Sequence, residues 1–108
     1  MDKKVVFTPE MAWTQQNYFP EDIGVKVLRE DDACGARTLL VRIPPEGEIP
    51  AHSHRGVVQR YVLEGRCEIG EGDFAAGSFS LLPEHCDVGP MKSRDGATVL
   101  LVYDPIVS

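Results

Sequence analysis

Short runs of β-branched and aromatic residues, separated by glycine and proline, limit most strongly how this chain can fold. An alternating apolar pattern over residues 23–28 is followed by runs at 38–43, 57–63, 66–69, 73–75, 79–82 and 98–103. No segment sustains the helical period of about 3.6 residues. Closely spaced short strands with glycine and proline between them are typical of an antiparallel sandwich or barrel. We therefore predict an all-β fold.

The length of the chain indicates one domain. With 108 residues it is long enough for one hydrophobic core and too short for two, so we treat residues 1–108 as a single domain. Residues 1–22 form an N-terminal arm. The pattern of residues 3–8 within it predicts a first short strand. Trp13, Tyr18 and Phe19 give the arm apolar surface, which we expect to cover one end of the core. We also expect a homodimer, in which the arm helps to form the interface and edge strands are covered.

Charge and hydropathy exclude two classes of partner. The net charge is −6, and the eleven lysines and arginines are spread along the chain. Nucleic-acid-binding proteins gather basic residues into a patch, so we expect no nucleic acid partner. No apolar run is long enough to cross a bilayer, and no long apolar stretch follows the N-terminal lysines. We expect a cytoplasmic protein with no membrane contact.

The chain has an odd number of cysteines. Cys34, Cys67 and Cys86 contain no C-x-x-C pair, which argues against a disulfide framework and against a zinc knuckle. Cys86 lies between His85 and Asp87, yet a buried, unreactive thiol is its expected role. We predict that all three are reduced thiols.

Two histidines stand at positions i and i+2 in the segment that runs from residue 43 to residue 65. Alternate side chains of a strand point to the same face, so His52 and His54 are expected to project into one space. That arrangement suits a pair of metal ligands. The alternative is that both histidines are merely structural or solvated. The glycine and proline before the pair and the β-type run after it favour a functional role.

Two spacings resemble the sequence motifs of the cupin superfamily. The first joins Gly47, His52-x-His54, position 58 and Gly65, and the second runs from Gly77 to Pro83 and ends near residues 89–90. The resemblance covers residues 36–103. Within the superfamily, the sequence looks most like the subgroup that includes the cupin domain of ChrR-type anti-sigma factors and acetylacetone dioxygenases. The resemblance implies an antiparallel jelly-roll β-barrel that usually carries one metal ion.

The chain departs from this pattern at four positions, one of which is Lys92 at the place of a late asparagine. Val58 stands where the family has a glutamate ligand, Val88 where it has a histidine ligand, and His85 where it has a glycine. An aliphatic side chain cannot coordinate a metal, and a retained site normally needs a third protein ligand. We predict His52, His54 and His85 as the ligands of a divalent ion, iron or zinc. Gln59, Asp87 and Cys86 are alternative third ligands, and His85 is otherwise a surface turn residue.

Arg60 is the second candidate functional residue. It shares parity with His52, His54 and Val58, so it should face the interior if no bulge intervenes. A buried guanidinium needs an anionic partner. We favour an internal or rim carboxylate, with Glu64 and Glu68 as the candidates, and the carboxylate of a ligand is the alternative.

Gln59 belongs to the face opposite Arg60 unless a bulge at Gly56 inverts the strand. The complete set of predicted ligand-binding residues is Arg60, Val58, Val88 and Gln59. Val58 and Val88 would form the apolar wall of the pocket.

Three functions remain open. The first is a small-molecule-binding cupin that acts as a metal-dependent, dioxygenase-like oxidoreductase on a small carbonyl compound, which is the activity that the resemblance implies. The second is a non-catalytic ligand-binding or sensory cupin with a degenerate metal site. The third is a structural cupin with a filled barrel. No acid, base or nucleophile can be assigned from spacing.

Overall fold

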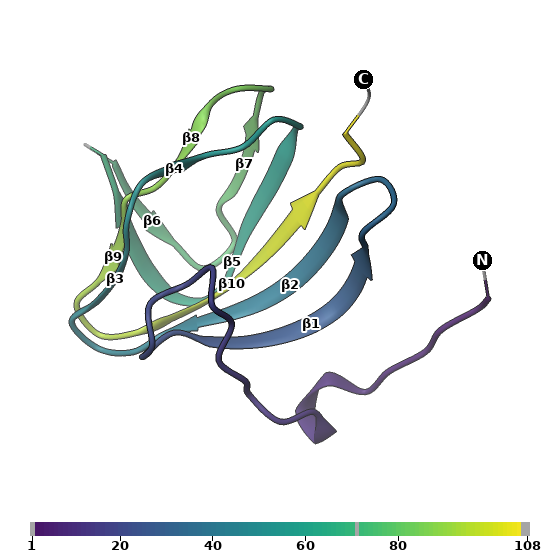
Figure 1. Ribbon diagram of the computed structural model, residues 1–108. Coiled ribbons are helices and arrows are strands. Elements are labelled where there is room, and N and C mark those ends of the chain that lie inside the picture. The colour runs from purple at the N-terminus through teal and green to yellow at the C-terminus, as the bar shows by residue number, and fades with distance from the viewer. Residues whose placement is uncertain (1, 71, 107–108) are drawn as a thin grey trace.

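The computed structural model describes residues 2–70 and 72–106. A 3-10 helix, η1 (Thr8–Glu10), lies in the N-terminal arm (Figure 1). The strands are β1 (Gly24–Asp31), β2 (Ala36–Ile43), β3 (Gly47–Ile49), β4 (His52–Ser53), β5 (Val58–Ile69), β6 (Gly72–Ala75), β7 (Phe79–Leu82), β8 (Asp87–Val88), β9 (Met91–Ser93) and β10 (Ala97–Tyr103). In these two ranges no helix has the length and apolar character to cross a membrane.

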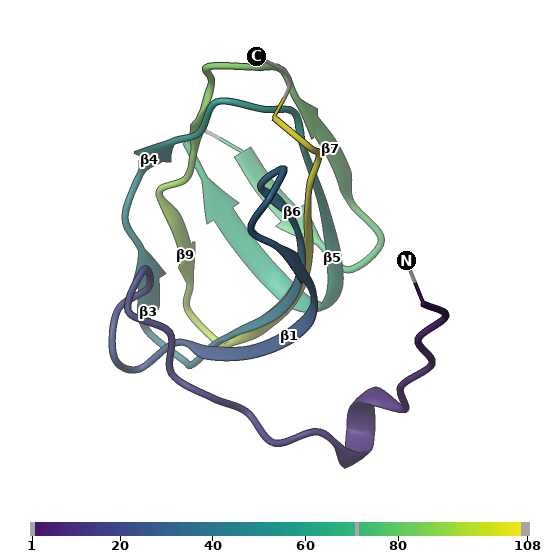
Figure 2. The same cartoon turned by 45° about the vertical axis from the view of Figure 1, so that its right-hand side comes forward.

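The strands form an antiparallel jelly-roll barrel. The main sheet has the order β1-β2-β10-β5-β9-β3, with β6 and β7 also paired to β5, and β4 pairs with β8 in a second small sheet. Figures 1 and 2 show how the main sheet curls, so that β3 and β9 lie across the interior from β1 and β2. The predicted all-β class is therefore confirmed. The runs at 57–63 and 66–69, expected as separate strands, form the single long strand β5.

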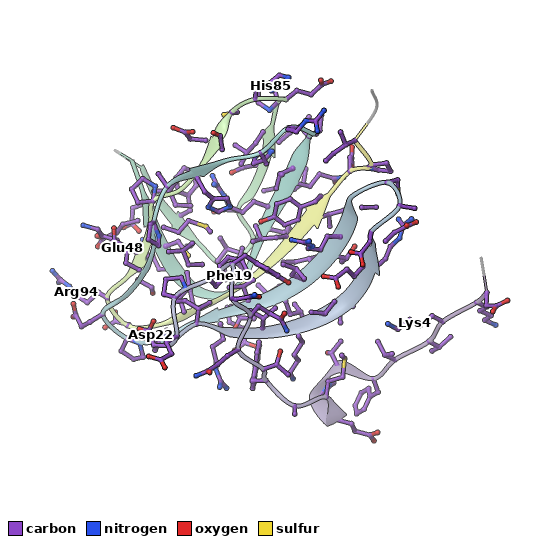
Figure 3. The ribbon with its side chains drawn as sticks, viewed as in Figure 1. Lys4, Phe19, Asp22, Glu48, His85 and Arg94 are labelled. Atoms are coloured by element: carbon purple, nitrogen blue, oxygen red, sulfur yellow. The ribbon has the colours of Figure 1, made fainter. Side chains whose placement is uncertain are left out.

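The N-terminal arm packs on its own chain. The Trp13 ring is contacted by two cations from the sheet, Lys26 and Arg42, each 4.4 Å from the ring centroid. Further along, Phe19 is 8% exposed and points into the barrel (Figure 3). The expectation that the arm covers one end of the core is confirmed for Phe19. The homodimer stays a prediction.

The expected strand over residues 3–8 is wrong. Residues 3–7 belong to no strand and have no ladder partners, and η1 begins at Thr8. The β-branched and aromatic residues there have no sheet to pack against, since Val5 and Phe7 are largely exposed. Strand propensity is expressed only where neighbouring strands offer packing.

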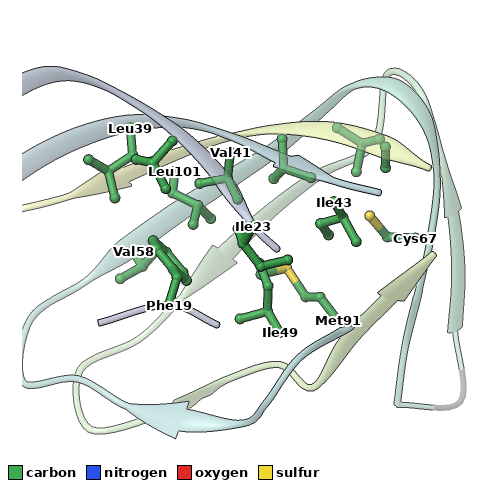
Figure 4. Packing of buried hydrophobic residues seen from close by; sticks show 14 residues of the cluster. Phe19, Ile23, Leu39, Val41, Ile43, Ile49, Val58, Cys67, Met91 and Leu101 are labelled. Atoms are coloured by element: carbon green, nitrogen blue, oxygen red, sulfur yellow. The ribbon is translucent and has the colours of Figure 1, made fainter. Parts of the chain in front are cut away.

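The core fills the inner face of the curled sheet. Alternate residues of β2, β5 and β10 point inward and meet side chains from the opposite wall and from the arm (Figure 4). Fully buried residues include Ile23, Val25, Leu39, Val41, Ile43, Ile49, Val58, Val62, Met91, Val99 and Leu101. This packing fixes which face of each strand looks into the barrel.

A bulge in β5 reverses its alternation. Along β10, Thr98 pairs with Glu64 and Val99 pairs with Val62, so Leu63 has no partner in that ladder. Val62 and Cys67 are both buried although their numbers differ by an odd step. An extra residue in one strand turns the following side chains to the other face. Residues before Leu63 therefore follow the predicted parity, and residues after it do not.

Candidate functional site

A cleft of about 330 Å³ opens beside the histidine pair. Its walls come from the arm, β2, β4 with the residues after it, and the end of β10. The lining residues used below are Tyr18, Phe19, Arg37, His52, His54 and Tyr103. A larger open hollow of about 590 Å³ lies over residues 42–45, 64–65 and 95–97 but contains no histidine. The chemistry-bearing side chains therefore gather at the first cleft.

The ring of His54 is oriented by the backbone. Its Nδ1 lies 2.6 Å from the carbonyl oxygen of Gly56. A carbonyl only accepts hydrogen bonds, so Nδ1 carries the proton in the neutral ring and Nε2 keeps its lone pair. Within residues 2–70 and 72–106, this Nε2 is buried and has no hydrogen-bond partner. A buried polar atom left without a partner costs about 1–3 kcal/mol, which a ligand could recover.

His52 repeats this orientation in a weaker form. Its Nδ1 lies 3.3 Å from the carbonyl oxygen of Pro50, and its ring meets Phe19 edge-on with the centroids 6.5 Å apart. The backbone of β4 holds the segment through the pairing of His52 with Val88. Both imidazoles therefore border one cleft, and each has Nδ1 directed to a carbonyl, which leaves Nε2 as the free nitrogen.

Arg37 brings a second unpartnered atom to the same cleft. Its Nε is buried and has no hydrogen bond in the described part of the chain, although Glu30 Oε2 is near enough, at 3.5 Å, for an ion pair. We regard this contact as a charge interaction, because it lacks hydrogen-bond geometry. The guanidinium lies over the Tyr18 ring, 4.5 Å from its centroid. Arg37 thus adds a positively charged donor group to the residues that line the cleft, beside the acceptor of His54.

Tyr103 completes the wall beside His54. The two rings meet edge-on with their centroids 6.0 Å apart. Burial raises the pKa of Tyr103 to about 12, although the positive charge of Arg37 acts in the opposite direction. The phenol therefore stays protonated at neutral pH and can donate a hydrogen bond. Sequence reasoning missed Arg37 and Tyr103, which face each other across the β2–β10 ladder.

The three predicted metal ligands do not come together. Among the residues that the structure describes, no three His, Cys, Asp or Glu side chains form a group that could hold a metal ion. His85 is exposed on the turn between β7 and β8, and its side chain lies at the outer end of the barrel (Figure 3). Its φ of 60° is left-handed, which explains why the resemblance has a glycine there. The His85 backbone N–H donates to the His54 carbonyl oxygen at 3.1 Å.

The alternatives for a third ligand do not complete the set either. Asp87 is exposed, and Cys86 is half-buried with its Sγ 3.6 Å from the Asp87 carbonyl oxygen. Val58, at the glutamate position, is a fully buried core residue. The described residues do not fit a resident metal ion, because two imidazoles without a third protein ligand make an incomplete site. We derive no chemical step through a metal.

We expect the thermal stability of the protein to be independent of divalent metal. A two-imidazole site contributes little to folding, whereas a structural site with a complete ligand set contributes strongly. Dialysis against EDTA should leave Tm unchanged, and mass spectrometry of the untagged protein should find metal below stoichiometric amounts. The prediction is contradicted by stoichiometric metal that survives chelation and disappears in His52→Ala.

The predicted ligand-binding residues have different environments. Arg60 is 5% exposed and points inward, as its parity predicted. Gln59 lies on the other face, half-buried, since Val58 and Arg60 on either side of it are both inward. The side chain of Val88 is outside the described part of the structure. Only Arg60 of this set combines burial with a functional group inside the barrel.

The structure differs from the prediction that Arg60 pairs with Glu64 or Glu68. Glu64 and Glu68 share its parity in the sequence, but both are exposed, and neither forms an ion pair with it. The reason is the bulge at Leu63, which turns the later part of β5 over. In the described chain, Arg60 therefore pairs with neither of the two carboxylates that we named.

Comparison with known proteins places this fold and site in context. The family model of the ChrR cupin-like domain matches residues 1–107. A comparison with curated proteins finds no match. A putative acetylacetone dioxygenase from Methylibium petroleiphilum is similar in structure, with a TM-score of 0.83 and 14% identity over 99% of this chain and 88% of that one.

Two further solved structures are similar. An acetylacetone dioxygenase from Acinetobacter johnsonii has a TM-score of 0.69 and 17% identity over 95% of this chain and 80% of that one. The Rhodobacter sphaeroides complex of SigE with the anti-sigma ChrR has a TM-score of 0.72 and 22% identity, over 89% of this chain and 50% of that one. At these identities the structures support the fold alone, whereas the family model spans nearly the whole sequence. The chain belongs to the ChrR cupin-like family.

Proposed function

We propose that the protein binds a small organic molecule in the cleft beside His52 and His54. The observation that carries the proposal is that His54 and Arg37, the two residues of the described chain that have a buried polar atom without a hydrogen-bond partner (Nε2 and Nε), both line this cleft. Native structures pair nearly all buried polar atoms, so each exception calls for an explanation. A ligand that accepts from Arg37 and donates to His54 explains both at once.

The walls of the cleft indicate the kind of molecule. Tyr18, Phe19 and Tyr103 offer ring surfaces that suit a small apolar body. Arg37 and the protonated phenol of Tyr103 can donate to a carbonyl oxygen, while the lone pair of His54 can accept from a hydroxyl. A small carbonyl compound that also carries a hydroxyl or enol group fits this set.

Dioxygenase-like turnover is the second candidate function. It is favoured by the free Nε2 atoms of His52 and His54, each with Nδ1 directed to a carbonyl oxygen, an orientation typical of metal ligands. The described residues give this candidate no third protein ligand. Binding without turnover, as in a sensory module, needs no such ligand, and we therefore prefer it.

Titration of the protein with acetylacetone, a small enolisable dicarbonyl, tests the cleft. We expect saturable binding in the wild type and a loss of about 10- to 100-fold in affinity in His54→Phe, because one buried hydrogen bond is lost. Isothermal titration calorimetry measures both affinities. His85→Ala is the matched control, since this histidine is exposed and should leave the affinity unchanged. Equal affinities of wild type and His54→Phe, or no binding at all, would falsify the proposal.

A further inference from the structure

We propose that Arg60 forms a second ligand site, inside the barrel next to β7, which binds the carboxylate of a small apolar monocarboxylate. The site is distinct from the cleft of the proposed function, because neither Arg60 nor its neighbour Ser80 lines that cleft. It rests on independent observations: the burial of Arg60, the absence of a counter-charge in the described chain, and access from one edge of the sheet.

The position of Arg60 is fixed by the core around it. On β5 it stands between Val58 and Val62, both buried and both inward. Across the ladders its partners are Leu101 of β10, fully buried, and Ser80 of β7. Residues paired across an antiparallel ladder point to the same face. Arg60 therefore extends into the barrel from the middle of its wall and is not a surface residue folded inward.

No negative group of the described chain neutralises this guanidinium. The ion pairs found in residues 2–70 and 72–106 use other arginines, namely Arg29, Arg37 and Arg66. The side-chain hydrogen bonds found within the same residue ranges likewise include none to the Arg60 side chain. The titratable groups that act on it are the thiols of Cys67 and Cys86. Burial raises the pKa of the Cys67 thiol, so this neighbour is uncharged at neutral pH.

Arg60 is a buried residue without an ion-pair partner in the described chain, and its guanidinium cannot lose its proton to relieve the cost of burial. Burial lowers the pKa of Arg60, but arginine starts so far above neutrality that it remains charged. Isolated buried charges are strongly penalised unless an opposite charge and hydrogen bonds compensate them. An anion that enters the barrel supplies the opposite charge.

The surroundings select a carboxylate over other anions. The planar guanidinium matches a carboxylate in a bidentate pair. Of the two buried cations in the described chain, Lys26 donates to the Thr8 carbonyl oxygen and lies over Trp13, so Arg60 alone faces an entering anion. A doubly charged phosphate would keep an uncompensated charge there, whereas a monocarboxylate is neutralised. The inward neighbours Val58, Val62 and Leu101 are aliphatic, so they favour an apolar body on the acid.

Access to Arg60 is from the side of β7. In the described chain β7 pairs only with β5, which makes it an edge of the sheet (Figure 1). Its inward residues Ser80 and Leu82 are half-buried, while the inward residues of β10, farther into the sheet, are fully buried. Cys86, on the segment that follows β7, is also half-buried. We therefore place the approach of a small ligand along this edge, where the inward residues are least buried.

Thermal unfolding with sodium formate and sodium benzoate tests the proposal, with sodium chloride at equal ionic strength and neutral benzamide as controls. A ligand that binds only the folded protein raises Tm. We expect formate and benzoate to raise the Tm of the wild type above the chloride value, and benzamide to leave it unchanged. Arg60→Met should lower the affinity for both acids by about 10- to 100-fold, as expected when a charge-assisted hydrogen bond is lost.

Arg66→Met is the matched control, because Arg66 is on the same strand but beyond the bulge and is exposed. The Tm of this variant should still rise with formate and benzoate as in the wild type. An equal response of Arg60→Met and wild type, or no response of the wild type to either acid, overturns the proposal. If Arg60→Met does not fold, NMR of the wild type decides. Formate must then shift the Nε–H signal of the buried arginine and leave those of exposed arginines in place.

The two sites can fail separately. Arg60→Met should still bind acetylacetone, and His54→Phe should still respond to formate. Loss of the formate response in Arg60→Met alone supports the inner site whatever the result for the cleft. A response to formate that depends on His54 and not on Arg60 would assign the anion to the cleft and overturn the inner site.

Discussion

Replacing Gly65 by alanine should lower the free energy of unfolding by about 3 kcal/mol or more, which is a large part of the stability of a domain of this size. The residue has a φ of 77°, a left-handed conformation that costs a side-chain-bearing residue about 1–2 kcal/mol. A Cβ there would also collide with the carbonyl oxygen of Gly96, a backbone atom that cannot rotate away. Overpacking of this kind adds about 1–3 kcal/mol.

Gly77→Ala separates the two causes. Gly77 has a φ of 96°, but a Cβ at this position would meet no atom within 4 Å. It should therefore show the conformational cost without the collision, and lose clearly less stability than Gly65→Ala. Urea unfolding of both variants measures the difference. Equal losses would mean that the backbone around Gly65 can shift to accommodate a Cβ. The close contact between Gly65 and Gly96 would then not be what fixes the alternation of β5.

The predictable part of the fold is the part that depends on local pattern. Alternation of apolar residues places β1, β2 and β10 to within a few residues, and the parity of β5 places Arg60 inside. The short strands β3, β4, β8 and β9 have two or three residues each, too few to show a period. They exist because the curled sheet offers them partners. The bulge at Leu63 is likewise invisible locally, since it is a property of pairing with β10.

The same division applies to the candidate site. The spacing of His52 and His54 is a local signal, and the structure brings both to one cleft. The meeting of Arg37 with Tyr103 depends on the register between two strands far apart in the sequence, which no local pattern reveals. The placement of His85 outside the cleft depends on a left-handed turn. The proposed binding at this site therefore depends on long-range register more than on motif.

Replacing Phe19 by alanine should reduce the free energy of unfolding by about 3–5 kcal/mol, the range for deleting a buried phenylalanine. Phe19 is 8% exposed and belongs to the core cluster although it lies in the N-terminal arm. Its ring also meets His52 edge-on at the wall of the cleft. The change should therefore weaken acetylacetone binding at temperatures where the variant is still folded. Denaturant unfolding and calorimetry measure the two effects.

Tyr18→Ala provides the comparison, because Tyr18 is the neighbour of Phe19 in the arm and is 41% exposed. It lies over Arg37 and contacts Phe19, with the two rings 5.2 Å apart, but it fills no core position. We expect a loss of about 1 kcal/mol or less, as for most exposed side chains. If Phe19→Ala were as mild as Tyr18→Ala, the arm would not close the barrel, and the cleft would owe its shape to the strands alone. A large difference in stability means that the arm is part of the core, and weaker acetylacetone binding in Phe19→Ala would mean that the same ring also supports the cleft.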